Sequence, residues 1–446
     1  MFTRTLYKTN VLLALALGCI PVLGSCNRAS EGAEITVLYY AGVPLGQMMR
    51  EEIPAFTRAT GIRVTYRELP YDAIRQREIA SITNRQGTYD VIFVDDVWMS
   101  EYARKGYLVP LDSFVTASKV DMNDFFESAR RAEAELDGRI WLMPQRADVQ
   151  VLFYRTDLFA DPQHRRGFQQ RFGRELRVPE TWEEYREVAT YFTDYGKTSG
   201  QVLWGSGETL KRPHFAFEFF AMRYWSMTGE QFFSDGGAPL FASPGGIRAL
   251  EFMRSLAPVA APGAANWAHD ETVSAFSQGQ LAMAPQWYDF YATLHGDTTL
   301  PIRNRFGVAL VPGTRVGPDS VRRTPSIGGG SLGIAADSRK TQAAWRFIEH
   351  MTGPEFMARA ALRGVIVPRR SSYADARVRQ QNPAVDVYLQ SLEMAWFRPR
   401  LVDYAEIEAM IGRAVSRGFV GEATPAAALQ EAANEARSKL GTGGGM

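Results

Sequence analysis

Acidic and aromatic residues stand together after several apolar stretches of the sequence, and these two residue types can bind a polyhydroxylated molecule. Trp98 follows closely on Asp95 and Asp96, and Trp287 follows the apolar run that begins at residue 281. An aromatic ring presents a flat apolar face to the C–H side of a sugar ring, and carboxylates accept hydrogen bonds from hydroxyl groups. Paired carboxylates repel anions, so the pattern favours a neutral solute over a phosphate or a dicarboxylate.

The candidate binding residues also have competing structural interpretations. Asp148 lies within an apolar strand, where it could instead pair with Arg146 two residues earlier on the same face. Asp95 and Asp96 could cap the helix that follows them, and we expect one carboxylate in each role. Gly329 belongs to a glycine run that lacks the Lys-Ser/Thr of a phosphate-binding loop and lets backbone approach a ligand or a neighbouring strand. The remaining candidates are Tyr40, Glu68, Trp98, Trp204, Trp225, Trp287 and Arg369.

The sequence motifs of common hydrolases are missing. None of the five histidines forms a metal-spaced pair, and no GxSxG motif occurs. Both cysteines, Cys19 and Cys26, lie in the first thirty residues, so the rest of the chain has no thiol nucleophile, disulfide or cysteine zinc site. A glycosidase needs only two carboxylates, and this enzyme class therefore stays open as an alternative. We expect a binding protein without catalysis, metal or cofactor.

Length and composition set the scale of the fold. A chain of 446 residues allows two to four domains, and 46% hydrophobic with 22% charged residues is typical of a globular protein with a sizeable core. The 50 basic and 49 acidic residues almost cancel, and this balance gives no indication of nucleic-acid binding.

The candidate residues need strands to position them. Strand patterns at 35–40, 62–69 and 91–94 alternate with helix patterns at 47–60 and 71–84, which predicts a parallel sheet covered by helices. In such sheets ligands bind beyond the carboxyl ends of the strands. The residues expected at those ends are Tyr39, Tyr40, Asp95, Asp96 and Trp98.

The first 33 residues are predicted to be a targeting and anchoring segment that does not belong to the fold. Arg4 and Lys8 precede an apolar run at 11–23 that is too short to span a membrane, which indicates a signal peptide over residues 1–25. The segment Leu23-Gly24-Ser25-Cys26 resembles a bacterial lipobox, although an ordinary cleavage site is the alternative. We expect Cys26 to be lipidated and residues 26–33 to form a tether, with the soluble body displayed on the outer side of a membrane in the cell envelope.

Several stretches in a characteristic order carry a family resemblance over nearly the whole mature chain. They are residues 89–93 leading to 102–111, 138–144 followed by 152–159, 179–182, 276–283 and 328–334. In this order and spacing the sequence resembles the extracellular solute-binding proteins of ATP-binding-cassette (ABC) importers, in the sugar-binding group that includes maltose-binding protein.

The resemblance implies a two-lobe α/β fold of the periplasmic-binding-protein type II class, with hinge-linked lobes, central sheets and flanking helices. The implied division is residues 34–146 with 308–352 for one lobe, 149–306 with 353–440 for the other, and a flexible tail at 441–446. Crossings are expected near Ala147 and near Phe306–Val311. By matching position, Asp148 and Trp287 would face the ligand, and Arg369 lies in a loop that often contacts it.

The implied function is that of a monomeric, lipid-anchored receptor. It would capture a neutral sugar or sugar alcohol by lobe closure and present it to the transmembrane subunits of an ABC permease. Within binding proteins the alternative is a polyamine, for which Asp95, Asp96, Asp148 and Glu68 could form an acidic cage. Outside them the alternative is a secreted carbohydrate-active enzyme.

The lipobox interpretation predicts the effect of one substitution. Cys26→Ala removes the thiol that would carry the lipid, so the protein should move from the membrane fraction to the soluble fraction when cells are fractionated and blotted. Unchanged membrane association would contradict the anchor.

Overall fold

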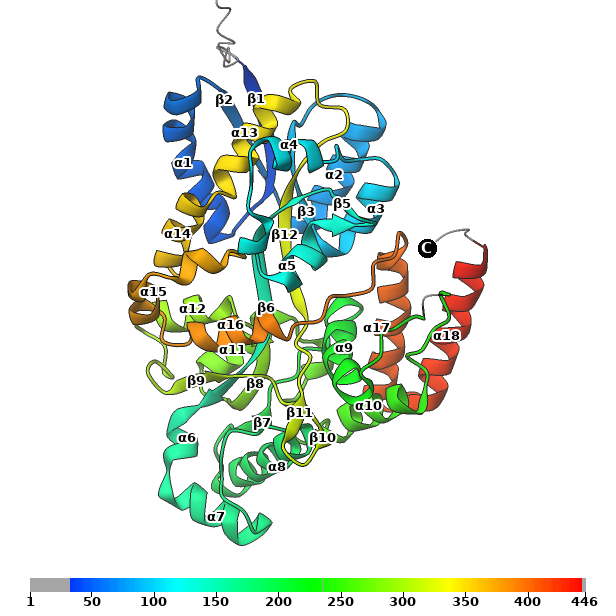
Figure 1. Ribbon diagram of the computed structural model, residues 1–446. Coiled ribbons are helices and arrows are strands. Elements are labelled where there is room, and N and C mark those ends of the chain that lie inside the picture. The colour runs from blue at the N-terminus through cyan, green and yellow to red at the C-terminus, as the bar shows by residue number, and fades with distance from the viewer. Residues whose placement is uncertain (1–32, 235, 443–446) are drawn as a thin grey trace, which may run out of the picture.

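The computed structural model describes residues 33–234 and 236–442, so the predicted signal peptide, Cys26, all but the last residue of the tether and the last four residues of the predicted tail lie outside it. The predicted parallel sheet is present. β1 (Glu34–Tyr40) lies between β2 (Arg63–Leu69) and β3 (Val91–Asp95) and pairs in parallel with both. Helices α1 (Pro44–Thr60) and α2 (Tyr71–Thr83) connect these strands (Figure 1).

The sheet continues into the second half of the molecule through one long strand. β6 (Met143–Arg155) pairs with β12 (Ile327–Ile334) up to Val149 and with β8 (Leu281–Trp287) from Gln150 onward. β12 also pairs with β3, which gives the strand order β2-β1-β3-β12-β6-β8-β7, with β7 at Trp204–Ser206 and β9 (Phe306–Ala309) beside β6. We call the part around β1–β3 the upper lobe and the part around β7–β9 the lower lobe (Figure 1).

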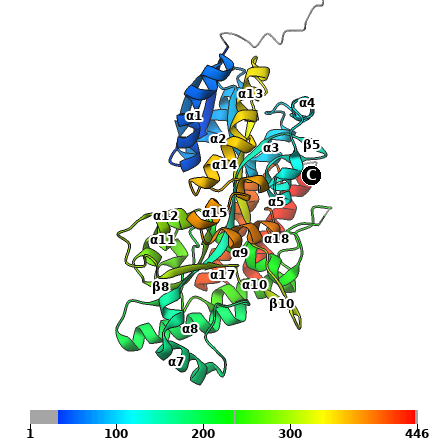
Figure 2. The same ribbon diagram turned by 60° about the vertical axis from the view of Figure 1, so that its left-hand side comes forward.

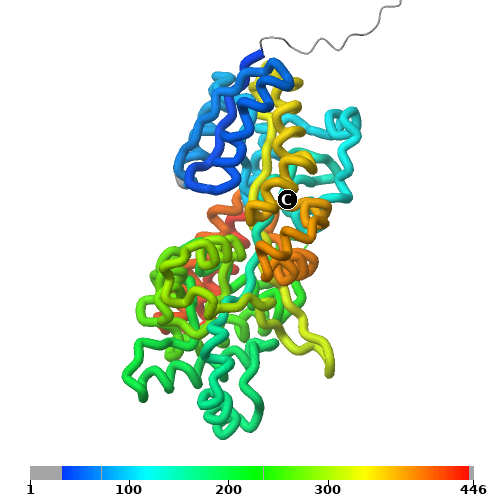
Figure 3. The backbone as a smooth tube through the Cα atoms, turned by 90° about the vertical axis from the view of Figure 1, so that its left-hand side faces the viewer, coloured from blue at the N-terminus to red at the C-terminus, as the bar shows by residue number. Residues whose placement is uncertain are grey.

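Helices and short strands cover both lobes. The upper lobe also contains η1 (Asp96–Trp98), α3 (Met99–Arg104), α4 (Asp112–Ala117), η2 (Met122–Asp124), α5 (Glu127–Glu133), β4 (Glu135–Leu136), β5 (Arg139–Ile140), α13 (Thr341–Met351), α14 (Pro354–Leu362) and η4 (Arg370–Tyr373). The lower lobe contains α6 (Thr156–Ala160), α7 (Pro162–Phe172), α8 (Trp182–Ser199), β7 (Trp204–Ser206), α9 (His214–Thr228), α10 (Pro244–Ser255), η3 (Ala264–Asn266), α11 (His269–Ser277), α12 (Phe290–Gly296), β10 (Thr314–Gly317), β11 (Ser320–Arg322), α17 (Tyr404–Val420) and α18 (Pro425–Thr442). Between the lobes lie α15 (Ala376–Gln381) and α16 (Val385–Glu393), and Figures 2 and 3 show the narrower middle that separates the two masses.

The second crossing between the lobes differs from the prediction. Residues 306–309 pair with the lower half of β6, and Arg322 donates hydrogen bonds to the carbonyls of Ser226 and Met227 on α9. The chain therefore stays with the lower lobe past Phe306–Val311 and returns to the upper lobe only along β12. Sequence spacing could not place this crossing, because the β10–β11 hairpin is inserted ahead of it.

The boundary predicted at residue 353 is also too early. Arg359 and Arg363, in and directly after α14, form ion pairs with Glu52 and Glu51 of α1 in the upper lobe. The predicted tail at 441–446 also begins later, because α18 continues to Thr442. The difference between the predicted and observed start of the tail is two residues, which is within the usual variation of an assigned helix end.

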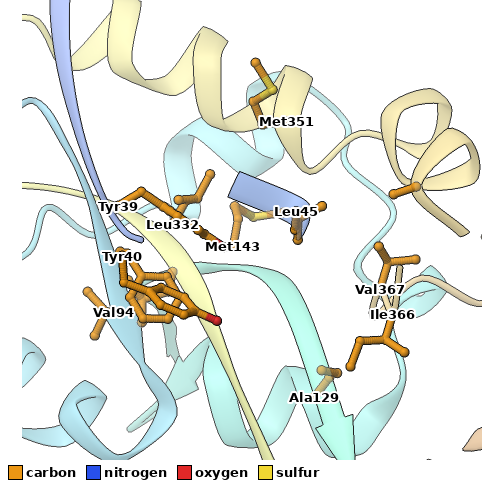
Figure 4. Packing of buried hydrophobic residues seen from close by; sticks show 14 of the residues in the cluster. Tyr39, Tyr40, Leu45, Val94, Ala129, Met143, Leu332, Met351, Ile366 and Val367 are labelled. Atoms are coloured by element: carbon orange, nitrogen blue, oxygen red, sulfur yellow. The ribbon is translucent and has the colours of Figure 1, made fainter. Parts of the chain in front are cut away.

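The upper core packs both faces of its sheet. All five residues of β3 are buried, as expected for a strand covered by helices on both sides. Figure 4 shows Tyr39 and Tyr40 of β1 near Met143 and Leu332 of the crossing strands. Tyr39 donates a hydrogen bond of 2.7 Å to Gln145 Oε1, and this bond connects β1 to β6. The next residue, Tyr40, is the last residue of β1.

A buried ion pair anchors the lower core and supports a prediction of stability. Arg223 is fully buried on α9 and donates to both carboxylate oxygens of Glu208, at 2.8 and 2.9 Å. Arg223→Leu would leave Glu208 charged and buried without its guanidinium, so we expect urea unfolding to show a loss of about 3–5 kcal/mol. The control is Arg413→Leu, which breaks a half-exposed pair with Glu435 and should cost less than about 1 kcal/mol. Equal losses in the two variants would contradict this difference.

Candidate ligand-binding cleft

A cavity of about 250 Å³ lies between the lobes where the strands cross. The upper lobe contributes its strand ends and α2, the crossing strands form one wall, and the lower lobe contributes α9, α11 and the end of β8. The cavity is lined by Tyr40, Val43, Tyr71, Asp95, Arg146, Asp148, His214, Glu218, His269, Trp287, Asp289, Phe290, Gly328, Gly329 and Arg398. Because both lobes line it, its shape depends on how closely they approach.

The strand ends position three of the predicted residues. Tyr40 ends β1, Asp95 ends β3 and Trp287 ends β8, and all three line the cavity. This is the edge at which ligands bind in open α/β sheets. Whether they contact a ligand remains a prediction.

Two glycines of β12 allow the crossing strands to come close together. A Cβ on Gly329 would lie 2.0 Å from the carbonyl oxygen of Arg146, and one on Gly328 would lie 2.9 Å from the ring of Trp287. A larger residue at either position would push β12 away from β6 or from the indole. Close approach to a neighbouring strand therefore explains Gly329, which also lines the cavity.

Arg146 holds two carboxylates on the wall of the cavity. Its guanidinium donates to Asp148 Oδ2 at 2.9 Å and to Asp289 Oδ2 at 2.7 Å. Burial raises the pKa of the Asp148 carboxyl, and the nearby charge of Asp289 raises it further. Burial opposes the charge of Arg146, but Tyr40 and the two carboxylates outweigh it and raise the pKa of Arg146. The predicted pairing of Asp148 with Arg146 and its place at the cavity are therefore both observed.

Arg398 joins the two lobes from within the cavity lining. It donates to Asp96 Oδ1 in the upper lobe at 2.5 Å and to Glu218 Oε1 in the lower lobe at 2.9 Å. The guanidinium and both carboxylates are almost completely buried. Asp96 is thus engaged by Arg398 and does not line the cavity. Asp95 accepts a capping bond from the N–H of Val97 at 3.3 Å and also lines the cavity. The expected division, with one carboxylate as the cap and the other at the site, is therefore not observed, because Asp95 occupies both positions and Asp96 occupies neither.

His214 extends this charge network into α17. Its Nε2 lies 3.0 Å from Glu218 Oε1 and its Nδ1 lies 2.8 Å from Glu408 Oε1. Burial disfavours the charged ring, but Glu218 and Glu408 outweigh burial and raise the pKa of His214 well above its ordinary value. Burial opposes the charge of Glu218 as well, yet His214 and Arg398 lower the pKa of Glu218 to about 2. Arg146, Arg398 and His214 therefore each contact at least two carboxylates in or beside the cavity wall.

Three predicted residues lie outside the lining of this cavity. Glu68 ends β2 but forms an ion pair with Arg50 of α1. Trp98 stacks on Tyr71 with ring centroids 5.3 Å apart and lines a neighbouring cavity. Trp204 lines a different hollow, together with residues 257, 258 and 260–265.

Two further predictions are wrong. Trp225 is completely buried on α9 and packs against Trp396 with ring centroids 5.9 Å apart, so it has no face open to the cavity. Arg369 is buried in the upper lobe, where it donates to the carbonyl of Thr352 at 2.7 Å and to Asp124 at 2.9 Å. Its guanidinium also lies over the ring of Phe125, which makes it a structural residue.

Sequence reasoning missed several cavity residues. Asp289 stands two residues after Trp287, so the strand-end argument could have found it. The others come from helices or from a loop, and no local motif marks them. They are Tyr71, His214, Glu218, His269, Phe290 and Arg398.

Two α/β lobes joined by crossing strands, with a polar cavity between them, define the class of hinged ligand-binding proteins. The family model for bacterial extracellular solute-binding proteins matches residues 43–358, and the chain belongs to that family. No helix in residues 33–234 and 236–442 is long and apolar enough to span a membrane. Within the same residues no group of three or more His, Cys, Asp or Glu side chains is arranged to hold a metal ion.

Three similar proteins illustrate the range of this family. A probable amino-acid ABC transporter periplasmic-binding protein of Sinorhizobium fredii is 24% identical, over 93% of this chain and 90% of its own. A mannitol-binding protein of Pseudomonas aeruginosa is 26% identical, over 73% of this chain and 71% of its own. The crystal structure of an ABC transporter solute-binding protein from Agrobacterium radiobacter with ribitol matches with a TM-score of 0.76 and 26% identity, covering 92% of this chain and 99% of that one.

The pKa of His214 predicts a pH dependence of stability. The folded state raises this pKa above the unfolded value of about 6.5, so the stabilisation from His214 is fully present below about pH 6.5 and is lost as pH rises through the folded pKa. His214→Asn should therefore lower the melting temperature most near pH 6 and flatten its decline at higher pH. The exposed His295→Asn serves as the control and should keep the wild-type slope. Parallel curves for wild type and His214→Asn would contradict the prediction.

Proposed function

We propose that this chain is the receptor of an ABC importer, binding one neutral sugar or sugar alcohol unit in the cavity between its lobes. The observation that carries the proposal is the set of side chains that form the wall of this cavity. Trp287 offers an aromatic face, and the carboxylates that line the cavity are held by Arg146, Arg398 and His214. Such a wall can exchange hydrogen bonds with hydroxyl groups without requiring a charge on the ligand.

The volume of the cavity supports a small unit. About 250 Å³ lies just below the roughly 300–1,000 Å³ typical of ligand pockets, which is consistent with one sugar ring or polyol chain. The ribitol complex and the mannitol-binding relative support the same class of ligand for this chain.

The charge pairing argues against the polyamine alternative. A polyamine needs unpaired carboxylates, whereas Asp148 is bound by Arg146 and Asp96 by Arg398. Glu68, the fourth member of the supposed cage, lies outside the cavity lining and pairs with Arg50. The carboxylate of an amino acid would likewise have to compete with the carboxylates already bound to Arg146 or Arg398.

The proposed cycle requires no chemical step on the ligand. Ligand contacts to both lobes favour the closed state by the difference between the affinities of the closed and open states for the ligand. The closed form then engages the permease subunits, a partnership that the ABC-transporter relatives support. Anchoring through a lipid on Cys26 is part of the same proposal.

A thermal-shift screen over sugars, polyols, amino acids and polyamines tests this function. A ligand at about a hundred times its Kd stabilises the folded protein by about 2.7 kcal/mol. Trp287→Ala and Asp148→Ala should each lose most of the shift produced by the best polyol or sugar, because both side chains line the cavity.

The matched control is Trp204→Ala, which removes a tryptophan from a different hollow and should retain the ligand-induced shift. Retention of the full shift in both cavity variants would mean that the ligand binds elsewhere. Conversion of the ligand to a product would refute a purely binding role.

A further inference from the structure

A cavity of about 900 Å³ lies between the lobes and shares no lining residue with the cavity proposed for the sugar. Its upper wall comes from the start of α4, from α5 and from the β4–β5 hairpin, and its lower wall comes from residues 231–234 after α9. Phe397 and residues 399–401, between α16 and α17, form a third side. Arg398 of the same segment lines the sugar cavity instead, so neighbouring residues face two different cavities. We call the larger one the hairpin cavity.

Three acids and three arginines line the hairpin cavity, and the acids are engaged by other groups. Glu135 and Asp137 form ion pairs at 3.2 and 3.3 Å with arginines outside the lining. Asp112 accepts a hydrogen bond from the backbone N–H of Ile140 at 3.2 Å. Among the residues that the structure describes, none of these carboxylates therefore pairs with an arginine of the same lining.

The arginines of the lining have weak carboxylate partners or none. Arg131 contacts the carboxylate of Glu127 at 3.6 Å, and both side chains are more than half exposed. Exposed pairs of this kind are weak and screened by salt, so Arg131 stays available to another anion. Neither Arg139, which is exposed on β5, nor Arg400 forms an ion pair within the described part of the chain.

Arg400 is held in place by uncharged groups. Its guanidinium donates to the backbone carbonyls of Arg131 and, at 2.9 Å, of Glu135. It also lies over the ring of Phe397 at 4.4 Å from the centroid, and the guanidinium of Arg131 lies 5.4 Å from the centroid of the same ring. Two like charges are thus fixed near each other on one wall, and an anion that contacted both would reduce their repulsion.

The charge of Arg400 is less well compensated than that of the two arginines in the sugar cavity. Burial lowers the pKa of Arg400, the neighbouring charge of Arg131 lowers it further, and the nearby carboxylates do not outweigh these effects. Burial acts in the same direction on Arg146 and Arg398, but the acids and tyrosines around them outweigh it and raise the pKa of both. A partly buried guanidinium without a carboxylate is a site where an anionic ligand gains most.

We propose that the hairpin cavity binds the phosphate group of a small solute through the guanidinium groups of Arg131 and Arg400. This inference is independent of the proposed sugar site. Guanidinium groups present paired N–H donors that match phosphate oxygens, and Arg139 would add a third positive charge. The volume lies within the roughly 300–1,000 Å³ of ligand pockets, which leaves room for the rest of a phosphorylated molecule.

Titration calorimetry with inorganic phosphate and with pyrophosphate tests the site. Sodium chloride keeps the ionic strength constant, so that general screening does not change between the titrations. We expect pyrophosphate to bind the wild-type protein with a Kd of about 1 mM or below, and more tightly than phosphate, because it presents more oxygens and more charge to the two guanidinium groups.

Two substitutions connect this affinity to the hairpin cavity. Arg400→Gln should weaken pyrophosphate binding at least about tenfold, and the exposed Arg131→Gln at least about threefold. The matched control is Arg370→Gln. The guanidinium of Arg370 likewise lies 4.4 Å from the centre of a phenylalanine ring, that of Phe126, but it pairs with Glu393, so this variant should keep the wild-type Kd.

Thermal melting without the anion shows whether each variant folds, and Arg131→Gln decides the test if Arg400→Gln does not. A Kd above about 1 mM for pyrophosphate in the wild type would overturn the site. An unchanged Kd in the folded variants would also overturn it, and so would equal weakening in Arg370→Gln, which would indicate a general effect of charge. No step uses a sugar, so failure here leaves the proposed function intact, and failure of the sugar screen leaves this site intact.

Discussion

The buried guanidinium of Arg398 is the constraint on which the cleft depends. Removing such a cation from water costs several kcal/mol, and only well-placed anions offset that cost. One anion, Asp96, comes from the upper lobe, and the other, Glu218, comes from the lower lobe. Glu218 in turn lies against His214, which also contacts Glu408. Satisfying one charge therefore fixes side chains from η1, α9, α17 and the segment before α17. Of these, α9 and the segment before α17 contribute residues to the cavity wall.

Arg146 plays the corresponding role on the crossing strand. It binds Asp148 on its own strand and Asp289 from the lower lobe, so the polar wall is already held in place before any ligand arrives. Such preorganisation reduces the entropy that binding must overcome. In the proposed function it would also favour a neutral ligand, because a charged ligand would compete with existing ion pairs whereas a hydroxyl group can add to their free hydrogen-bonding capacity.

The sequence predicted the residues that local structure positions. Tyr40, Asp95 and Trp287 end strands, and strand patterns are visible in the sequence. The same argument failed for Glu68, because β2 is the edge strand of the sheet and Arg50 of α1 reaches it there. Trp225, a candidate without a strand-end argument, belongs to the core because α9 is buried over most of its surface. Arg398 is 302 residues from Asp96 and 180 from Glu218, and no spacing rule predicts a contact at that range.

Arg398 lies in the segment between α16 and α17, where it would be affected by a separation of the lobes. The N–H of Trp396 bonds to Pro325 and the N–H of Ile327 bonds to Trp396, so the backbone two residues before Arg398 is fastened to the start of β12. If the lobes separated about these two backbone hydrogen bonds, Asp96 would move away from Glu218. The guanidinium of Arg398 could then stay in contact with only one of the two carboxylates. The carboxylate left behind would have to be hydrated, which couples opening to the entry of water into the cavity. Since Arg398 and Glu218 line that cavity, a solute that donated hydroxyl groups there would, in the proposed function, act on the same equilibrium that governs closure.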